Sequence, residues 1–160
     1  MIDYQKLEDD ICSLLNIKSA KVSVLPDNNK EATPNFKVPT VYIACVGSKF
    51  EDSENNQLII QAERINFEAI IRSQTRRGKS GVFAILKELG TKLQGLKFNG
   101  YDPILLDSHG HIDGTQNDWN YMLSFHLDGK CVATQRDPES IDTDHNIYAL
   151  KQVELDSTFN

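Results

Sequence analysis

The segment that most constrains the fold of this chain is a long run of alternating apolar and polar residues. Over residues 57–72 the apolar positions fall into two blocks, which are Leu58, Ile60 and Ala62 and then Ile65, Phe67, Ala69 and Ile71. An alternation of period two predicts a β-strand that lays one face on a core. The alternation changes phase between the two blocks, which predicts a β-bulge or bend near Glu63 and Arg64. A strand of this length needs neighbours, so the chain must be built around a sheet.

Two other segments show helical spacing. In residues 2–15 and residues 82–96 the apolar side chains recur at intervals of three and four. They are Ile2, Leu7, Ile11, Leu14 and Leu15 in the first segment and Val82, Ile85, Leu86, Leu89, Leu93 and Leu96 in the second. Each pattern predicts an amphipathic helix that turns an apolar stripe toward a sheet.

The other strands before the second helix are shorter. Residues 21–25 and residues 40–47 alternate in polarity and predict strands. Between them, residues 26–39 are polar, contain three prolines and have no periodicity, so they predict a long surface loop. Residues 48–56 are polar and are expected to turn the chain back toward the long strand.

Three β segments are expected after the second helix. They cover residues 103–112, 119–127 and 130–134. Asp-Gly pairs at residues 113–114 and 128–129 separate these segments. An Asp-Gly pair is a strong hairpin signal because both residues tolerate a positive φ. The pairs therefore predict two tight turns and a closing β-meander.

The order of elements is helix, three strands, helix, three strands. This order predicts an α+β fold, with a mostly antiparallel β-sheet packed against two α-helices and a β-meander at its end. Residues 1–134 are expected to form one domain, and residues 135–160 an acidic polar tail or arm. The apolar residues of that tail that could pack are Ile147, Tyr148, Leu150 and Val153.

Charge and apolar content exclude several classes of protein. The formal net charge of −6 argues against a general nucleic-acid binder, because such proteins grip phosphates with clustered Lys and Arg. No apolar run approaches the roughly 20 residues of a membrane span, and the first ten residues are acidic where a secretory signal is basic. A cytosolic protein without membrane contact is expected. Cys12, Cys45 and Cys131 are odd in number and lie in apolar patterns, which favours small core residues over a disulfide framework.

The sequence DSHGHID at residues 107–113 resembles the metal-binding strand end of zinc hydrolases. His109 and His111 would bind one metal, and further ligands would have to come from His126, His145 or nearby aspartates. The barrels that carry this motif need about 250 residues, and His126 falls among odd-numbered apolar residues, so it is expected to point away from the core. A polar hairpin end explains the motif better, and a small metal-dependent hydrolase remains the alternative function.

A second motif, SQTRRGKSG at residues 73–81, resembles a phosphate-binding loop before a helix. The first glycine of that loop is replaced by Ser73, and an antiparallel sheet is not its usual setting. Arg76, Arg77 and Lys79 nevertheless concentrate positive charge on one loop of an acidic protein. The alternatives are a solvated loop and a contact with an acidic partner or with DNA that passes close by.

The chain as a whole resembles the tail terminator proteins of tailed phages, in particular the Mu-like family of contractile tails and related injection systems. The resemblance covers about residues 1–133. It is carried by a helix ending in LLNI, by AKVSVLPDN, by a strand with Pro39, Val41 and Ile43, by Gln61 and Phe67 in QAERINFEAII, and by a closing strand with Trp119, Tyr121, Leu123 and Phe125.

This resemblance implies a structural virion protein without catalytic residues, cofactor or metal. Such proteins form a ring, usually of six copies, that caps the tail tube, ends its growth and joins the head-side connector. The implied partners are copies of the same chain, the tail tube and sheath proteins and the connector, with DNA only passing through the lumen. The implied location is the virion tail, assembled in the host cytoplasm.

Two interface hypotheses follow for this chain. Arg76, Arg77 and Lys79 would face the lumen or an acidic neighbouring ring, and residues 147–153 would form an arm that adds a strand to a neighbouring subunit. The alternatives to these are a solvated loop and a frayed terminus. An adaptor from another assembly would need only the same kind of domain, so the sequence leaves that class open too.

Overall fold

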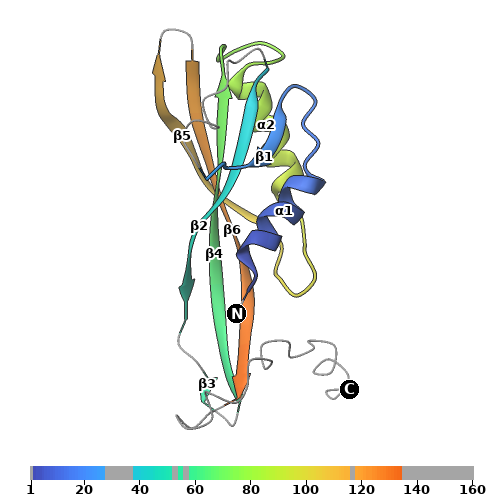
Figure 1. Cartoon of the computed structure of the whole chain (residues 1–160), viewed down its shortest axis with the longest axis vertical. Helices are drawn as coiled ribbons and strands as arrows, with labels where there is room; N and C mark the ends of the chain where they lie inside the picture. Colours follow the sequence, from blue (N-terminus) through green and yellow to red (C-terminus); the bar gives the residue numbers. More distant parts are fainter. Residues whose placement is uncertain (1, 28–37, 52–53, 56–57, 116–117, 135–160) are drawn as a thin grey trace.

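The computed structural model describes residues 2–27, 38–51, 54–55, 58–115 and 118–134, and these residues form a six-stranded sheet with both helices on one face (Figure 1). The elements are α1 (Tyr4–Leu14), β1 (Lys21–Val24), β2 (Thr40–Phe50), β3 (Glu54–Asn55), β4 (Leu58–Ser73), α2 (Val82–Leu93), β5 (Leu105–Thr115) and β6 (Asp118–Thr134). The strand order is β1-β2-β4-β6-β5, with β3 beside β4, and only the β1–β2 pair is parallel. The predicted α+β class and mostly antiparallel sheet are confirmed.

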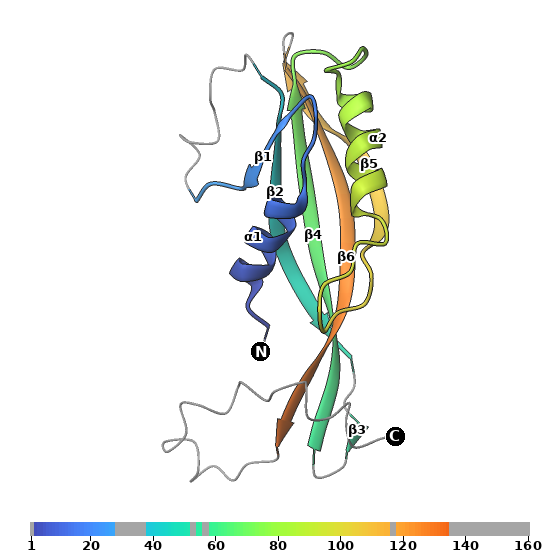
Figure 2. The ribbon, with the colours of Figure 1, turned by 90° about the vertical axis from the view of Figure 1, so that its right-hand side faces the viewer.

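Both helices lie where their apolar stripes predict. Asp3 is the N-cap of α1, and its carboxylate accepts a hydrogen bond from the Lys6 N–H at 3.0 Å and so caps the first turn. It packs on β1 and β2 through the buried Leu7 and Ile11. α2 packs on β4, β5 and β6, beside α1 on the same face of the sheet (Figure 2). No helix in the described part of the chain is long and apolar enough to cross a membrane.

The core lies between the helices and the middle of the sheet. Phe67 on β4 and Phe125 on β6 stack there with ring centroids 5.4 Å apart, and neither is more than 1% exposed. From Glu63 onward the inward positions of β4 are all buried, namely Glu63, Ile65, Phe67, Ala69, Ile71 and Ser73. The buried Phe and Ile side chains account for most of the apolar surface that this strand removes from water, and so for most of its contribution to the stability of the fold.

A bulge or a bend was predicted near Glu63 and Arg64, and the bulge is wrong. β4 pairs with β6 without a break from Leu58 to Ser73, and the register shift lies on β2 instead, between Cys45 and Gly47. Gly47 has a φ of 148°, which a residue with a side chain rarely adopts. The sequence changes phase because Ile60 and Ala62 fall on the face of β4 opposite Ile65, while the inward position before Ile65 holds the buried Glu63; the pairing of the strand itself is regular.

Both predicted Asp-Gly turns are also wrong. The 113–114 pair lies inside β5, opposite Trp119 and Asn120, and the 128–129 pair lies inside β6. β6 therefore runs as one strand, where two had been expected. At its Gly129 the ring of Tyr101 approaches so closely that an added Cβ would lie 2.9 Å from it, which is why a glycine is needed at this place.

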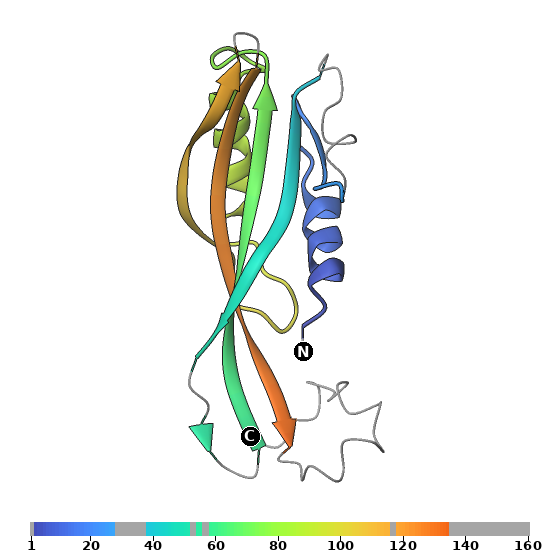
Figure 3. The same ribbon diagram turned by 60° about the vertical axis from the view of Figure 1, so that its left-hand side comes forward.

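β2 also extends further than predicted, through Phe50, where a polar turn was expected. Beyond the helices, β4 and β6 continue as a two-stranded ribbon toward β3, which makes the molecule elongated (Figure 3). Residues 135–160 and most of the predicted 26–39 loop fall outside the described residues, so the predicted tail, the predicted loop and the predicted division at residue 134 stay predictions.

Candidate functional site: an arginine–aromatic patch

The loop of residues 74–81 joins β4 to α2 at the end of the molecule where β6 begins (Figure 1). Its backbone caps α2, because the Val82 N–H donates to the Thr75 carbonyl at 3.0 Å and the Phe83 N–H donates to the Arg76 carbonyl at 3.2 Å. A phosphate-binding loop needs such amides free to bind the anion. Here the loop itself satisfies them, so the geometry gives no support to nucleotide binding.

Gly81 makes this loop conformation possible. A Cβ at Gly81 would lie 2.4 Å from the Arg77 carbonyl oxygen, which is backbone and cannot move aside. We expect Gly81→Ala to lower the free energy of unfolding by about 1–3 kcal/mol, as measured by urea denaturation. Gly110→Ala is the matched control, since nothing lies within 4 Å of a Cβ there. Equal effects of the two substitutions would contradict this account of the loop.

The side chain of Arg76 lies between two aromatic rings. Its guanidinium carbon is 5.5 Å from the centroid of Phe83 and 5.4 Å from that of Trp119. The rings of Tyr121 and Phe83 meet edge to face, with centroids 5.8 Å apart. The centroid of the His111 ring is 5.3 Å from that of Tyr121 and 5.7 Å from that of Trp119. We call these five residues the arginine–aromatic patch. Each cation–π contact at such a site stabilises by about 0.5–1 kcal/mol and holds Arg76 in place.

The patch is open to solvent and carries positive charge. Phe83 is 43% exposed, and Arg77 and Lys79 are exposed on the loop that carries Arg76. Neither Arg77 nor Lys79 makes an ion pair with another residue that the structure describes. Aromatic and arginine side chains are enriched at the centres of protein interfaces. The arrangement is therefore suited to binding an acidic protein surface.

Three of the residues predicted for an interface thus lie together. Arg76 is part of the patch, and Arg77 and Lys79 are exposed on the same loop. The aromatic members were not foreseen as interface residues, although alternation on the last strand places Trp119 and Tyr121 on one face. The predicted arm, with Ile147, Tyr148, Leu150 and Val153, lies outside the described residues.

The histidines of DSHGHID are divided between two environments. His109 and His111 are exposed on β5, and His111 belongs to the patch. His126 does lie on the sheet face away from the helices, as expected, but it is buried there, with Nδ1 2.7 Å from Asp107 Oδ1. In the described part of the chain no three His, Cys, Asp or Glu side chains are placed to hold a metal ion. His145 lies outside it.

Sequence reasoning did not identify the buried carboxylate of Glu63 on β4. Glu63 accepts hydrogen bonds from the Tyr4 hydroxyl and, at 3.0 Å, from the Cys131 thiol. Burial by itself raises the pKa of Glu63, but hydrogen bonds from Cys131, Tyr4 and Ser48 outweigh it and hold that pKa below its ordinary value. The cluster ties the start of α1 to the sheet.

The thiols are not activated. Burial, together with the hydrogen bond to Glu63, raises the pKa of Cys131 to about 11. Burial, with Asp9 and Glu8 nearby, raises the pKa of Cys12 to about 11 as well. Both thiols are protonated at neutral pH, whereas a nucleophilic cysteine needs its thiolate.

Comparison with known proteins identifies a family for this chain. The family model described as Gp37 protein matches residues 16–148, which is most of the chain and includes β1 to β6 and α2. No curated protein matches the sequence.

Proposed function

We propose a function for this chain from the premise that it belongs to the Gp37 protein family, which is phage-related. The chain is a structural protein of the virion tail. It forms a ring of six copies that caps the tail tube, ends the growth of the tube and joins it to the head-side connector. The family match supports a phage protein, and the pattern resemblance to Mu-like tail terminators supports the place in the tail, the ring and the capping role.

The geometry supports a subunit that assembles with its own kind. The arginine–aromatic patch sits at one end of an elongated molecule, and the acidic chain, with a net charge of −6, offers acidic surface to a neighbour's patch. A head-to-tail contact of this type joins two different surfaces. Repeated contacts close into a ring when the rotation between neighbouring subunits adds up to a full turn. The same patch would equally suit an acidic surface on the tail tube or sheath proteins.

Reversing the charge of the loop should weaken assembly. We expect Arg77→Glu combined with Lys79→Glu to lower the affinity between subunits at least about tenfold, because like charges would then face each other. Sedimentation velocity over a range of concentrations measures this. Lys97→Glu is a matched control, since Lys97 is exposed on the loop after α2, away from the patch. An unchanged affinity in the double variant would remove the loop from the interface.

Native mass spectrometry of the purified chain, alone and with the tail tube protein, tests the ring itself. We expect a species of six 18.1 kDa chains without bound metal, alone or on the tube. A metal-loaded monomer in both samples would overturn the proposal in favour of a metal-dependent hydrolase that uses DSHGHID. Monomer without metal in both samples would also contradict a ring.

A further inference from the structure

One edge of the sheet is only partly covered. β1 pairs in parallel with Thr40 to Ile43 of β2, and the last bond in this line runs from the Leu25 N–H to the Ile43 carbonyl at 2.9 Å. Pro26 follows, and proline has no N–H with which to continue the ladder. β2 itself continues to Phe50. Among the described residues no strand pairs with this edge of β2 beyond Ile43.

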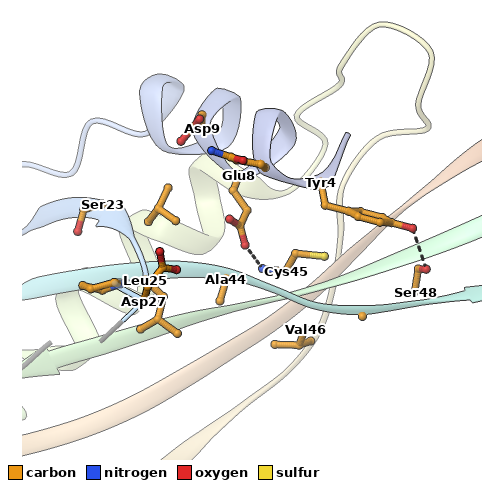
Figure 4. Close-up of a pocket in the computed structure, with 14 residues that line it drawn as sticks. Tyr4, Glu8, Asp9, Ser23, Leu25, Asp27, Ala44, Cys45, Val46 and Ser48 are labelled. Atoms are coloured by element: carbon orange, nitrogen blue, oxygen red, sulfur yellow. Dashed lines mark hydrogen bonds between the residues drawn. The ribbon is translucent and has the colours of Figure 1, made fainter. Parts of the chain in front are cut away.

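A side chain occupies the first position of this open edge. The Cys45 N–H donates to Glu8 Oε1 at 2.5 Å, as Figure 4 shows. The carboxylate of α1 thus stands where the carbonyl oxygen of a neighbouring strand would lie. An open edge is a template for pairing with another chain. Here a removable side chain covers the first position, and no strand of the described residues pairs with the positions beyond it.

The space beside this edge is a groove. Its volume is about 1170 Å³, and it lies between α1, residues 23–27 and residues 44–48. Its charged lining residues are Glu8, Asp9 and Asp27, with no Lys or Arg among those that line it. The floor is accessible, since Val46 is 51% exposed and nothing lies within 4 Å of a Cβ built at Gly47.

We propose that this groove accepts an extended segment of a partner protein that carries Lys or Arg, and that the segment adds as a strand to β2 in line with β1. A backbone carbonyl of the segment replaces Glu8 as the acceptor of the hydrogen bond from the Cys45 N–H. The released Glu8 carboxylate then forms an ion pair with a Lys or Arg of the incoming strand. Main-chain bonds supply affinity in such strand addition, and side chains supply specificity. This inference rests on the edge and the groove, and is independent of the proposed ring.

Charge decides between the possible occupants. Residues 135–160 of a second copy contain six acidic and two basic residues, so they would bring like charge to the three carboxylates. A basic segment meets them with opposite charge. The structure therefore favours a different protein as the partner.

The test uses the full chain, isotope-labelled for NMR, and a blocked peptide of about seven residues that alternates lysine with valine, long enough to span residues 44–50 at about 3.3 Å per residue. We expect saturable binding, with the largest shifts at the amides of Cys45 to Phe50. The same peptide with glutamate for lysine, or with N-methylated backbone, should bind at least tenfold more weakly. A peptide with the sequence of residues 135–160 is tested for binding in the same way.

Two variants locate the charges. Glu8→Gln with Asp27→Asn should weaken binding of the lysine peptide by roughly three- to tenfold, the size expected for two exposed pairs. Asp10→Asn is the control, because Asp10 lies on α1 but pairs with Lys6 at 2.5 Å and does not line the groove. No binding of the lysine peptide, equal binding of its N-methylated form, or shifts elsewhere would overturn the proposal. Tighter binding of residues 135–160 would overturn the basic partner and assign the groove to a second copy.

Discussion

Phe125→Ala is expected to lower the free energy of unfolding by about 3–5 kcal/mol. Phe125 is fully buried on β6 and stacks on Phe67 at 5.4 Å, between the centre of the sheet and the helices. Removing the ring loses its burial and leaves a cavity that regular β-strands cannot close by moving. Urea denaturation monitored by circular dichroism measures the change.

Phe83→Ala is the matched control for this core substitution. The Phe83 ring is 43% exposed on α2 and contacts Arg76 and Tyr121. Its loss should cost about 1 kcal/mol of folding stability, because little buried surface disappears. It should still weaken assembly, since the patch loses an exposed ring. Equal loss of stability in the two variants would show that Phe125 does not lie in the core as described.

Glu63→Gln is expected to destabilise the protein by on the order of 1–3 kcal/mol at pH 7, because hydrogen bonds to a charged acceptor are stronger than those to a neutral amide. The pKa of Glu63 is lowered in the folded state, so its carboxylate stabilises the fold above the ordinary Glu pKa of about 4.3. That contribution is lost as the pH falls through the lowered value. The two proteins should therefore differ at neutral pH, and the difference should shrink as the pH falls from about 4.3 toward the lowered pKa.

Stability measured by urea denaturation from pH 7 down to pH 3 checks this. Glu68→Gln is the control, because Glu68 lies on the same strand but on the opposite face of the sheet, across from Ser124. A constant difference between Glu63→Gln and the native protein over the whole range would contradict the role of the charge. Such a constant difference would mean that the hydrogen bonds from Tyr4 and Cys131 do not favour the ionised form of Glu63.

Periodicity was enough to predict the helices and the long strand β4. The helical stripes through Ile11 and Leu89 are read directly from spacing, because each helix has one face on the sheet and one in water. Glu63 was missed because a charged residue at an inward position looks like a change of phase. Its partners come from α1, β2 and β6, and no local pattern shows that these residues meet.

Glycine was misread for a similar reason. Gly129 follows an aspartate, so the local signal predicts a turn, but the residue is needed for the close approach of Tyr101. Asp128 is held in the strand by Arg64, which donates to it twice, at 2.9 and 3.2 Å. Tertiary contacts thus override a local turn preference.

Only the charged residues of the candidate interface could be predicted from the sequence. The positive charge of Arg76, Arg77 and Lys79 stands out in an acidic sequence. The contact of Arg76 with Trp119 depends on the pairing of β4 with β6, which brings Ser73 opposite Trp119. A pairing register between strands 46 residues apart cannot be read from either strand alone.

The length of the tails assembled with and without this chain tests the central claim most directly. Electron microscopy of particles made by the gene cluster that encodes it gives the distribution of tube lengths. If the chain caps the tube, its removal should give headless tubes of variable and excessive length, and supplying it again should restore one length. Tails of normal, uniform length joined to heads in its absence would contradict the account.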